Sequence, residues 1–201
     1  MPQGAPPLLE DQLSLFDPGD DLGLPEGLRY EPDFLSEAEE AHWLGQVRGL
    51  DLAPMRYKSY LAKRRVISFG GRYDFDDNRL EPTADLPENF HPLRQKVADW
   101  LGRPPTDLVQ VLVAEYSPGT PLGWHRDVPE FEDIAGVSLL SEATMRFRPY
   151  PPGAPARSDV LKLVLAPRSI YRLSGPSRWA WQHSVVPTRA LRYSVTFRTA
   201  R

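Results

Sequence analysis

Two histidines and one aspartate of this chain could share a metal ion. His125 and Asp127 stand two positions apart in the run Trp-His-Arg-Asp, which follows an apolar segment and a Pro-Gly turn. In an extended segment, side chains two positions apart project to the same face, so an imidazole and a carboxylate can bind one ion. The pattern is short and recurs by chance, but functional residues are common in loops that follow strands.

The third ligand is found by elimination. The chain has four histidines; His42 falls on one expected helix and His91 begins another, so His183 remains. In the strand expected around His183, alternation places Trp179 and Trp181 on the same face as the imidazole. A histidine among tryptophans is also a common core residue, so this assignment depends on the other two ligands.

The type of ligand narrows the choice of metal. Two histidines and one carboxylate are typical of non-haem iron(II) sites, which keep three coordination positions open for a co-substrate and oxygen. Zinc is the competing metal for such a set. Because the sequence has no cysteine, disulfides, zinc-thiolate sites and cysteine nucleophiles are excluded.

Residues 192–198, Arg-Tyr-Ser-Val-Thr-Phe-Arg, predict a strand with an unusual polar face. One face carries Arg192, Ser194, Thr196 and Arg198, and the other carries Tyr193, Val195 and Phe197. An unpaired buried charge costs several kcal/mol, whereas guanidinium groups bind carboxylates through two hydrogen bonds. A dicarboxylate such as 2-oxoglutarate would satisfy both arginines. The alternative is that this face points to water.

Length and composition indicate one globular domain. The chain has 201 residues, of which 41% are hydrophobic and 25% charged. No apolar run approaches the roughly 18 residues of a membrane span, and residues 1–11 lack the regions of a secretory signal. We therefore expect a cytoplasmic protein without membrane contact.

Charge is unevenly distributed along the chain. The net charge is −3, which alone argues against a nucleic-acid partner. Residues 1–40 hold eleven acids and one base, whereas residues 142–201 hold eleven bases and two acids. A second basic run comprises Arg56, Lys58, Lys63, Arg64, Arg65 and Arg72. This asymmetry permits a positive face on a slightly acidic protein, although solvated strand faces explain each cluster equally well.

Periodicity and turn residues predict two helices followed by strands. Residues 1–24 are expected to be a flexible tail, and residues 25–201 one domain. Ser36 and Glu39 form a capping box for a helix that ends at Gly49, and a second helix is expected from Phe90 to Leu101. Strands are expected at 64–69, 109–116, 134–140, 143–147, 160–165, 169–173, 179–186 and 191–199. The result is an α+β protein built on a barrel or jelly roll.

In this order and spacing, the motifs resemble the AlkB family of iron(II)- and 2-oxoglutarate-dependent dioxygenases. The resemblance runs from about residue 25 to the C-terminus. Its pieces are Tyr116-x-Pro-Gly, His125-x-Asp127, Leu173-Ser-Gly-Pro-Ser-Arg178-x4-His183, Arg192-Tyr-x-x-Thr-Phe-Arg198 and the segment Arg65 to Asp74. It implies a double-stranded β-helix (a jelly roll) preceded by helices and a nucleotide-recognition lid.

The resemblance also implies roles for individual residues. His125, Asp127 and His183 would bind iron(II), and Arg192 would pair with the distal carboxylate of 2-oxoglutarate. Its other co-substrate residues would be Tyr116, Ser194 and Arg198, with Arg198 near the iron-bound end. The best-known bacterial member has asparagines at the positions of Ala114 and Ser194, so part of the co-substrate's hydrogen-bond shell differs here.

The implied activity is oxidative removal of alkyl groups from nucleic-acid bases, with release of succinate and formaldehyde. The basic, aromatic stretch in the first half of the chain would form the lid, because Lys and Arg bind phosphates while aromatic rings stack on bases. The substrate-binding candidates are Arg64, Arg65, Phe69, Arg72, Tyr73 and Glu130. Glu130 follows Pro129, which stands where the best-known bacterial member of the family has an acidic residue that helps choose the base. Alkylated DNA is the expected substrate, in preference to RNA, and a monomer is expected.

The segment Gln12-Leu-Ser-Leu-Phe16 resembles the peptide by which bacterial repair proteins bind the sliding clamp, where Leu and Phe enter an apolar pocket.

Three alternative functions remain open. One is an oxygenase of the same fold that acts on RNA, protein or a small molecule. A non-enzymatic, cupin-like metal-binding module is the second, although cupins usually offer clustered histidines with a glutamate. The third is a zinc hydrolase, which would leave Arg192 and Arg198 unexplained.

Overall fold

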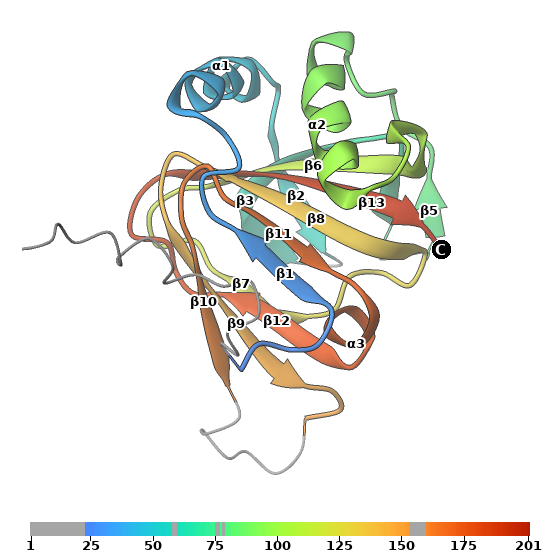
Figure 1. Ribbon diagram of the computed structural model, residues 1–201, viewed down its shortest axis with the longest axis vertical. Coiled ribbons are helices and arrows are strands. Elements are labelled where there is room, and N and C mark those ends of the chain that lie inside the picture. Colours follow the sequence, from blue (N-terminus) through green and yellow to red (C-terminus); the bar gives the residue numbers. More distant parts are fainter. Residues whose placement is uncertain (1–22, 58–59, 75–76, 78, 153–159) are drawn as a thin grey trace, which may run out of the picture.

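The computed structural model describes residues 23–57, 60–74, 77, 79–152 and 160–201 (Figure 1). Most of the expected tail, including Gln12 to Phe16, lies outside the described residues. Within the described part, no helix is long and apolar enough to cross a membrane.

Both helices predicted from the sequence are confirmed. Helix α1 (Glu37–Arg48) begins with the expected capping box, in which the Ser36 hydroxyl accepts from the Glu39 amide and the Glu39 carboxylate accepts from the Ser36 amide. Such a box satisfies amides that the first helical turn leaves without partners. Helix α2 (His91–Leu101) ends at Gly102, whose φ of 67° is the left-handed conformation that glycine adopts without a steric penalty.

The strands form two sheets that face each other, with antiparallel pairing throughout. The major sheet has the order β1 (Leu28–Glu31), β11 (Ile170–Leu173), β8 (Phe131–Leu139), β13 (Arg192–Ala200), β6 (Leu108–Tyr116), β3 (Tyr60–Phe69), β2 (Ala53–Tyr57). The minor sheet has the order β10 (Leu161–Leu165), β9 (Ala143–Pro149), β12 (Trp181–Val185), β7 (Leu122–His125). A separate ribbon pairs β4 (Arg72–Asp74) with β5 (Arg79–Glu81). Helices α1 and α2 cover the face of the major sheet that points away from the minor sheet (Figure 1). This is the expected double-stranded β-helix.

Strand β13 lies between β6 and β8 and separates two environments. Tyr193, Val195 and Phe197 pack into the core beneath the helices, where full burial of each such side chain contributes about 1.5–3 kcal/mol. The opposite face, with Arg192 and Arg198 at its ends, points between the sheets and lines a large cavity. The predicted alternation is therefore confirmed, and the arginine face does not point to water.

One element was predicted wrongly. The strand expected over residues 179–186 begins only at Trp181, because Gly175–Trp179 forms a short helix, α3, before it. Ser174 and Ser177 cap this helix reciprocally. Trp179 therefore does not share a strand face with His183.

Candidate metal centre

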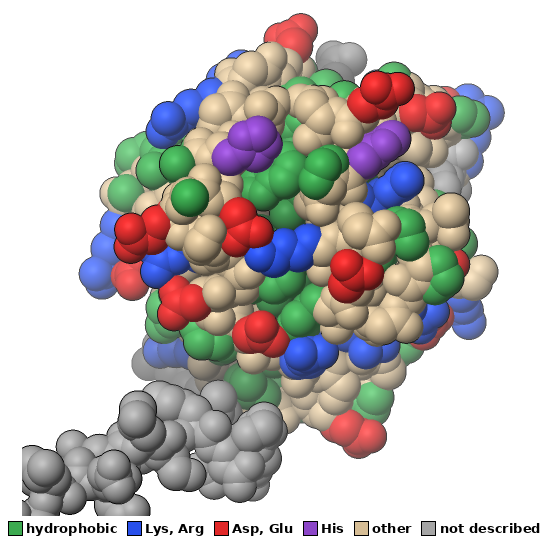
Figure 2. Space-filling view, turned by 45° about the horizontal axis from the view of Figure 1, so that its top comes forward, with side chains coloured by type: hydrophobic (Ala, Val, Ile, Leu, Met, Phe, Trp, Pro, Cys, Tyr) green, Lys and Arg blue, Asp and Glu red, His purple; other side chains and the backbone are tan. Residues whose placement is uncertain are grey.

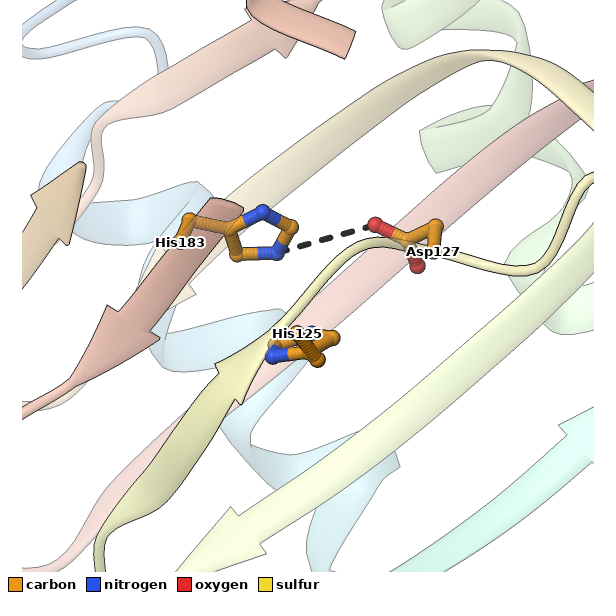
Figure 3. A group of neighbouring side chains, drawn as sticks. All are labelled: His125, Asp127 and His183. Atoms are coloured by element: carbon orange, nitrogen blue, oxygen red, sulfur yellow. Dashed lines mark ion pairs between the residues drawn. The ribbon is translucent and has the colours of Figure 1, made fainter. Parts of the chain in front are cut away.

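His125, Asp127 and His183 converge although they come from distant parts of the chain (Figure 3). One ligand atom of each lies within 4.8 Å of the others. His125 ends β7 and is paired directly opposite His183 of β12, which places their ring centroids 4.2 Å apart. Asp127 lies in the loop after β7, with its Oδ2 3.6 Å from Nε2 of His183.

The electrostatics of the three side chains suit a metal ion. Burial lowers the pKa of His183 to about 3 and also lowers the pKa of His125, so both imidazoles are neutral near pH 7, the form that binds metals. Burial alone would raise the pKa of Asp127, but Arg198 and the two histidines bring it well below its usual value. Nδ1 of His125 lies 2.9 Å from the carbonyl oxygen of Gly123, to which it can only donate, so Nε2 keeps its lone pair.

Arg198 orients the carboxylate of Asp127. Its Nε and Nη2 donate to Oδ1 at 3.1 and 2.8 Å, while Nη1 donates to Gln110 at 2.7 Å. The charge on Arg198 is therefore already balanced inside the protein. Its predicted contact with the iron-bound end of 2-oxoglutarate stays a prediction.

Arg192 lies in a different environment. Its side chain is only 2% exposed, and Nε donates to the Ser138 hydroxyl at 3.0 Å. The Tyr116 ring lies 5.2 Å from its guanidinium carbon. Burial lowers the pKa of Arg192, and no carboxylate of the described residues pairs with it. A buried cation without an acidic partner is costly, and a ligand carboxylate would remove that cost.

Sequence reasoning missed Tyr171, whose ring enters the same cavity from β11. Gly136 of β8 is paired opposite it, and a Cβ at Gly136 would lie 2.4 Å from the Tyr171 ring. Burial raises the pKa of Tyr171 to about 12, so its hydroxyl remains a hydrogen-bond donor at neutral pH. The available signal was Gly136 itself, since a glycine inside a strand often marks a close approach.

Substitution of Gly136 by alanine is expected to displace the Tyr171 ring. Overpacking of this kind typically costs about 1–3 kcal/mol of unfolding free energy, and the displaced ring would also narrow the space beside Arg192. Denaturant unfolding and 2-oxoglutarate titration would measure the two effects. The double variant G136A/Y171L should recover most of the lost stability, and a single variant as stable as the wild type would contradict the predicted clash.

Arg178 is a second residue whose structural role the sequence did not reveal. It is 2% exposed, and its Nη2 donates to the carbonyl oxygens of Val128 and Phe131 at 2.7 and 2.9 Å. These bonds fix the loop that follows Asp127. The short helix α3 is therefore the element that holds this loop in place.

The substrate-binding candidates divide into two groups. Arg64, Arg72 and Tyr73 line the cavity, whose volume is about 1140 Å³. Arg65 points to the other face of β3, where it pairs with Glu115 at 3.2 Å. Phe69 is 5% exposed and belongs to the core beneath the helices.

The prediction that Arg65 and Phe69 bind the substrate is therefore wrong, because neither side chain lines the cavity. Glu130 is absent from the cavity lining, although its charge contributes, after burial, to the raised pKa of Tyr73.

Comparison with known proteins identifies the class to which this fold and site belong. A family model described as the 2OG-Fe(II) oxygenase superfamily matches residues 27–198. The chain therefore belongs to this superfamily, whose members use iron(II), 2-oxoglutarate and oxygen. Two neutral imidazoles with a carboxylate suit the metal, and the unpaired Arg192 suits the dicarboxylate.

The relatives narrow the class to the AlkB family of dioxygenases. "Alpha-ketoglutarate-dependent dioxygenase AlkB" of Escherichia coli is 29% identical over 136 residues, covering 62% of this chain and 61% of its own. "Alkylated DNA repair protein ALKBH8 homolog" of Arabidopsis thaliana is 31% identical, covering 86% of this chain and 54% of its own. "tRNA (carboxymethyluridine(34)-5-O)-methyltransferase alkbh8" of Xenopus tropicalis is 31% identical over 83% of this chain but only 26% of its own. The chain thus spans about a quarter to three fifths of these relatives.

The solved structures agree on the fold. The structure of OsALKBH1 matches with a TM-score of 0.64 at 17% identity, over 86% of this chain and 96% of that one. A prolyl hydroxylase from Trichoplax adhaerens matches with a TM-score of 0.60 at 15% identity, over 87% and 83%.

Proposed function

We propose that this dioxygenase removes alkyl groups from nitrogen atoms of nucleic-acid bases, with damaged DNA as its substrate. The observation that carries the proposal is the composition of the cavity. The three candidate metal ligands and Arg192 line it, as do Arg64, Arg72 and Tyr73, of which Arg72 forms an ion pair with Glu81 at 2.9 Å. A cavity lined by arginines and an aromatic ring suits a base flanked by phosphates. The names of the E. coli and Arabidopsis relatives, a dioxygenase and an alkylated DNA repair protein, agree with this chemistry.

In this proposal each residue of the cavity has a defined task. His125, Asp127 and His183 would hold iron(II), with Arg198 fixing the carboxylate. Arg192, Tyr116 and Ser194 would hold 2-oxoglutarate by its distal carboxylate. When bound, the metal and 2-oxoglutarate supply the oxidation of an N-alkyl carbon by oxygen, with release of succinate and carbon dioxide.

The apolar side chains around the site would exclude water and position the base. Leu122, Phe131 and Met145 line the cavity beside the histidines. A base that enters must leave its stack, which costs a few kcal/mol and is cheapest for damaged or single-stranded sites. The lid expected from the sequence would contribute Tyr73 for stacking and Arg64 for phosphate contact.

Reversal of charge at Arg64 tests the lid assignment. Arg64 lines the cavity, and its Nη2 donates to the Met55 sulfur at 2.8 Å. We expect R64E to weaken oligonucleotide binding about tenfold or more and to reduce the salt dependence by about 0.7 in the log–log slope. Fluorescence anisotropy at several salt concentrations would measure both, with R94E on helix α2 as the matched control. Unchanged binding by R64E would discard the lid assignment.

Substrate turnover tests the proposal directly. The purified protein, iron(II) and 2-oxoglutarate would be mixed with oligonucleotides of one sequence, as DNA or RNA, that carry an N-methylated base. We expect formaldehyde and succinate in equal amounts, with faster release from DNA. Succinate without formaldehyde from either nucleic acid would contradict the proposal and favour a protein or small-molecule substrate.

RNA is the second candidate substrate, because the Xenopus relative is named as a tRNA methyltransferase. The same assay decides between the two: a higher kcat/KM for the RNA oligonucleotide would replace DNA by RNA in the proposal.

The sliding clamp stays a predicted partner through Gln12 to Phe16. A peptide of residues 8–20 should bind purified clamp, and absence of binding would remove the prediction.

A further inference from the structure

The outer face of the minor sheet gathers basic and aromatic side chains. Met145 and Phe147 of β9 point into the core between the sheets, so Arg146 and Arg148 alternate to the outside. Lys162 of β10 is paired directly opposite Arg146 and is exposed. We call the set Trp124, Arg126, Arg146, Arg148, Tyr150 and Lys162 the outer cationic face.

Aromatic rings and neutral groups hold the arginines of this face. The guanidinium carbons of Arg146 and Arg148 lie 4.9 and 4.5 Å from the ring of Trp124. Nε of Arg146 donates to the Ser184 hydroxyl at 3.1 Å, and Nε of Arg148 donates to the Gln182 side chain at 2.8 Å. Two guanidinium groups therefore share one indole ring.

Arg126 extends the same arrangement. Its guanidinium carbon lies 3.7 Å from the ring of Tyr150, and Nη1 donates to the backbone carbonyl of Trp179 at 3.0 Å. Such stacking pre-positions the guanidinium, which is planar by its own delocalisation.

The acidic side chains of the described residues leave this charge unpaired. Among the described residues, none of the four basic side chains of the outer cationic face forms an ion pair, whereas Arg65, Arg103 and Arg172 each do. Arg146 and Lys162 also stand opposite each other in the ladder, an arrangement of like charges that destabilises a sheet. The face over α1 and α2 differs, since acidic and basic side chains alternate on it (Figure 2). An uncompensated cluster of this kind is suited to an anion.

The outer cationic face reaches the mouth of the cavity. Trp124 precedes His125 on β7, the edge strand of the minor sheet, and it also lines the cavity. Arg126 lies between the two ligands His125 and Asp127 in sequence and points to solvent. A chain that inserts one unit into the cavity would therefore pass its neighbouring units over this edge.

We infer that the outer cationic face binds consecutive phosphates of the nucleic-acid strand that flanks the base in the cavity. The inference rests on the proposed function, since it presumes a nucleic-acid substrate. Phosphates recur along a nucleic-acid strand with every nucleotide, and guanidinium groups bind them through two hydrogen bonds. Long substrates would gain contacts that a trinucleotide cannot make.

The test compares R146Q/R148Q with R48Q/R94Q, a double variant that removes the same charge from α1 and α2. Binding of an unmodified single-stranded fifteen-mer would be measured by anisotropy at several salt concentrations. We expect R146Q/R148Q to raise Kd about tenfold. The slope of log affinity against log salt concentration should fall in magnitude by about 1.4, the value for two phosphates of a single strand. R48Q/R94Q should stay within twofold, and R146K/R148K should regain the slope because lysine keeps the charge.

Turnover separates this inference from the proposed function. With a methylated base in a trinucleotide or a fifteen-mer, the wild type should favour the fifteen-mer through KM, and the KM ratio should fall toward one in R146Q/R148Q. Demethylation of both substrates with equal KM, or binding by R146Q/R148Q within twofold of the wild type, would overturn the inference and leave the function standing. If no nucleic acid is demethylated but R146Q/R148Q still lowers the salt dependence of binding, the inference about the outer cationic face is retained and the proposed function is rejected. Tighter binding of a polyglutamate peptide, lost in R146Q/R148Q, would assign the face to an acidic protein instead.

Discussion

Replacement of Asp127 by alanine is expected to abolish turnover, with a loss of at least about a thousandfold, which corresponds to about 4 kcal/mol. The substitution removes the only carboxylate among the three converging side chains. It also leaves Arg198 buried without its partner, which typically costs about 3–5 kcal/mol of unfolding free energy. Succinate release would report turnover, and denaturant unfolding in the presence of a chelator would report stability without metal.

Asp127→Asn separates the two effects. The amide keeps the shape of the side chain and one oxygen that Arg198 can donate to, so we expect a smaller loss of stability with a similar loss of turnover. Succinate release by D127A within tenfold of the wild type would show that this carboxylate is not a metal ligand.

Replacement of Arg192 by methionine is expected to raise the KM for 2-oxoglutarate by about a hundredfold or more. Loss of one partner from a buried, hydrogen-bonded charge pair costs about 2–5 kcal/mol of binding. The same substitution is expected to stabilise the fold. Burial lowers the pKa of Arg192, which means that folding disfavours its charged form. Without co-substrate, R192M should unfold at a higher denaturant concentration than the wild type.

Direct titration of 2-oxoglutarate in the presence of manganese(II), which supports no turnover, would measure the affinity. R189M is the matched control, since Arg189 is exposed. An affinity in R192M within threefold of the wild type would contradict the assignment of the carboxylate pocket.

The parts of the fold that local patterns determine were predictable. The capping box at Ser36, the glycine after α2 and the alternation along β13 each follow from a few adjacent residues. The same alternation predicted which face of β13 meets the cavity. His183 could be chosen only because the other histidines fell on helices.

The rest depended on pairing between distant strands. Tyr171 enters the cavity because β11 pairs with β8 at Gly136, and no local pattern gives that register. Arg65 and Phe69 were predicted to bind the substrate because their segment resembles one in the AlkB family. On β3, however, both side chains point away from the cavity. The pairing of Arg198 with Asp127 was also not predicted, because 71 positions separate the two residues in the sequence.

The centre draws its parts from both sheets. His125 and His183 belong to the minor sheet, whereas Arg192 and Arg198 belong to β13 of the major sheet. A co-substrate held between the metal and Arg192 would act as a crosslink between the two layers and resist their separation. By thermodynamic reciprocity, side chains that set the distance between the two sheets would also change the affinity for the co-substrate, even where they lie far from the metal centre. Repacking the interior is therefore a route to altered catalysis that leaves every ligand in place.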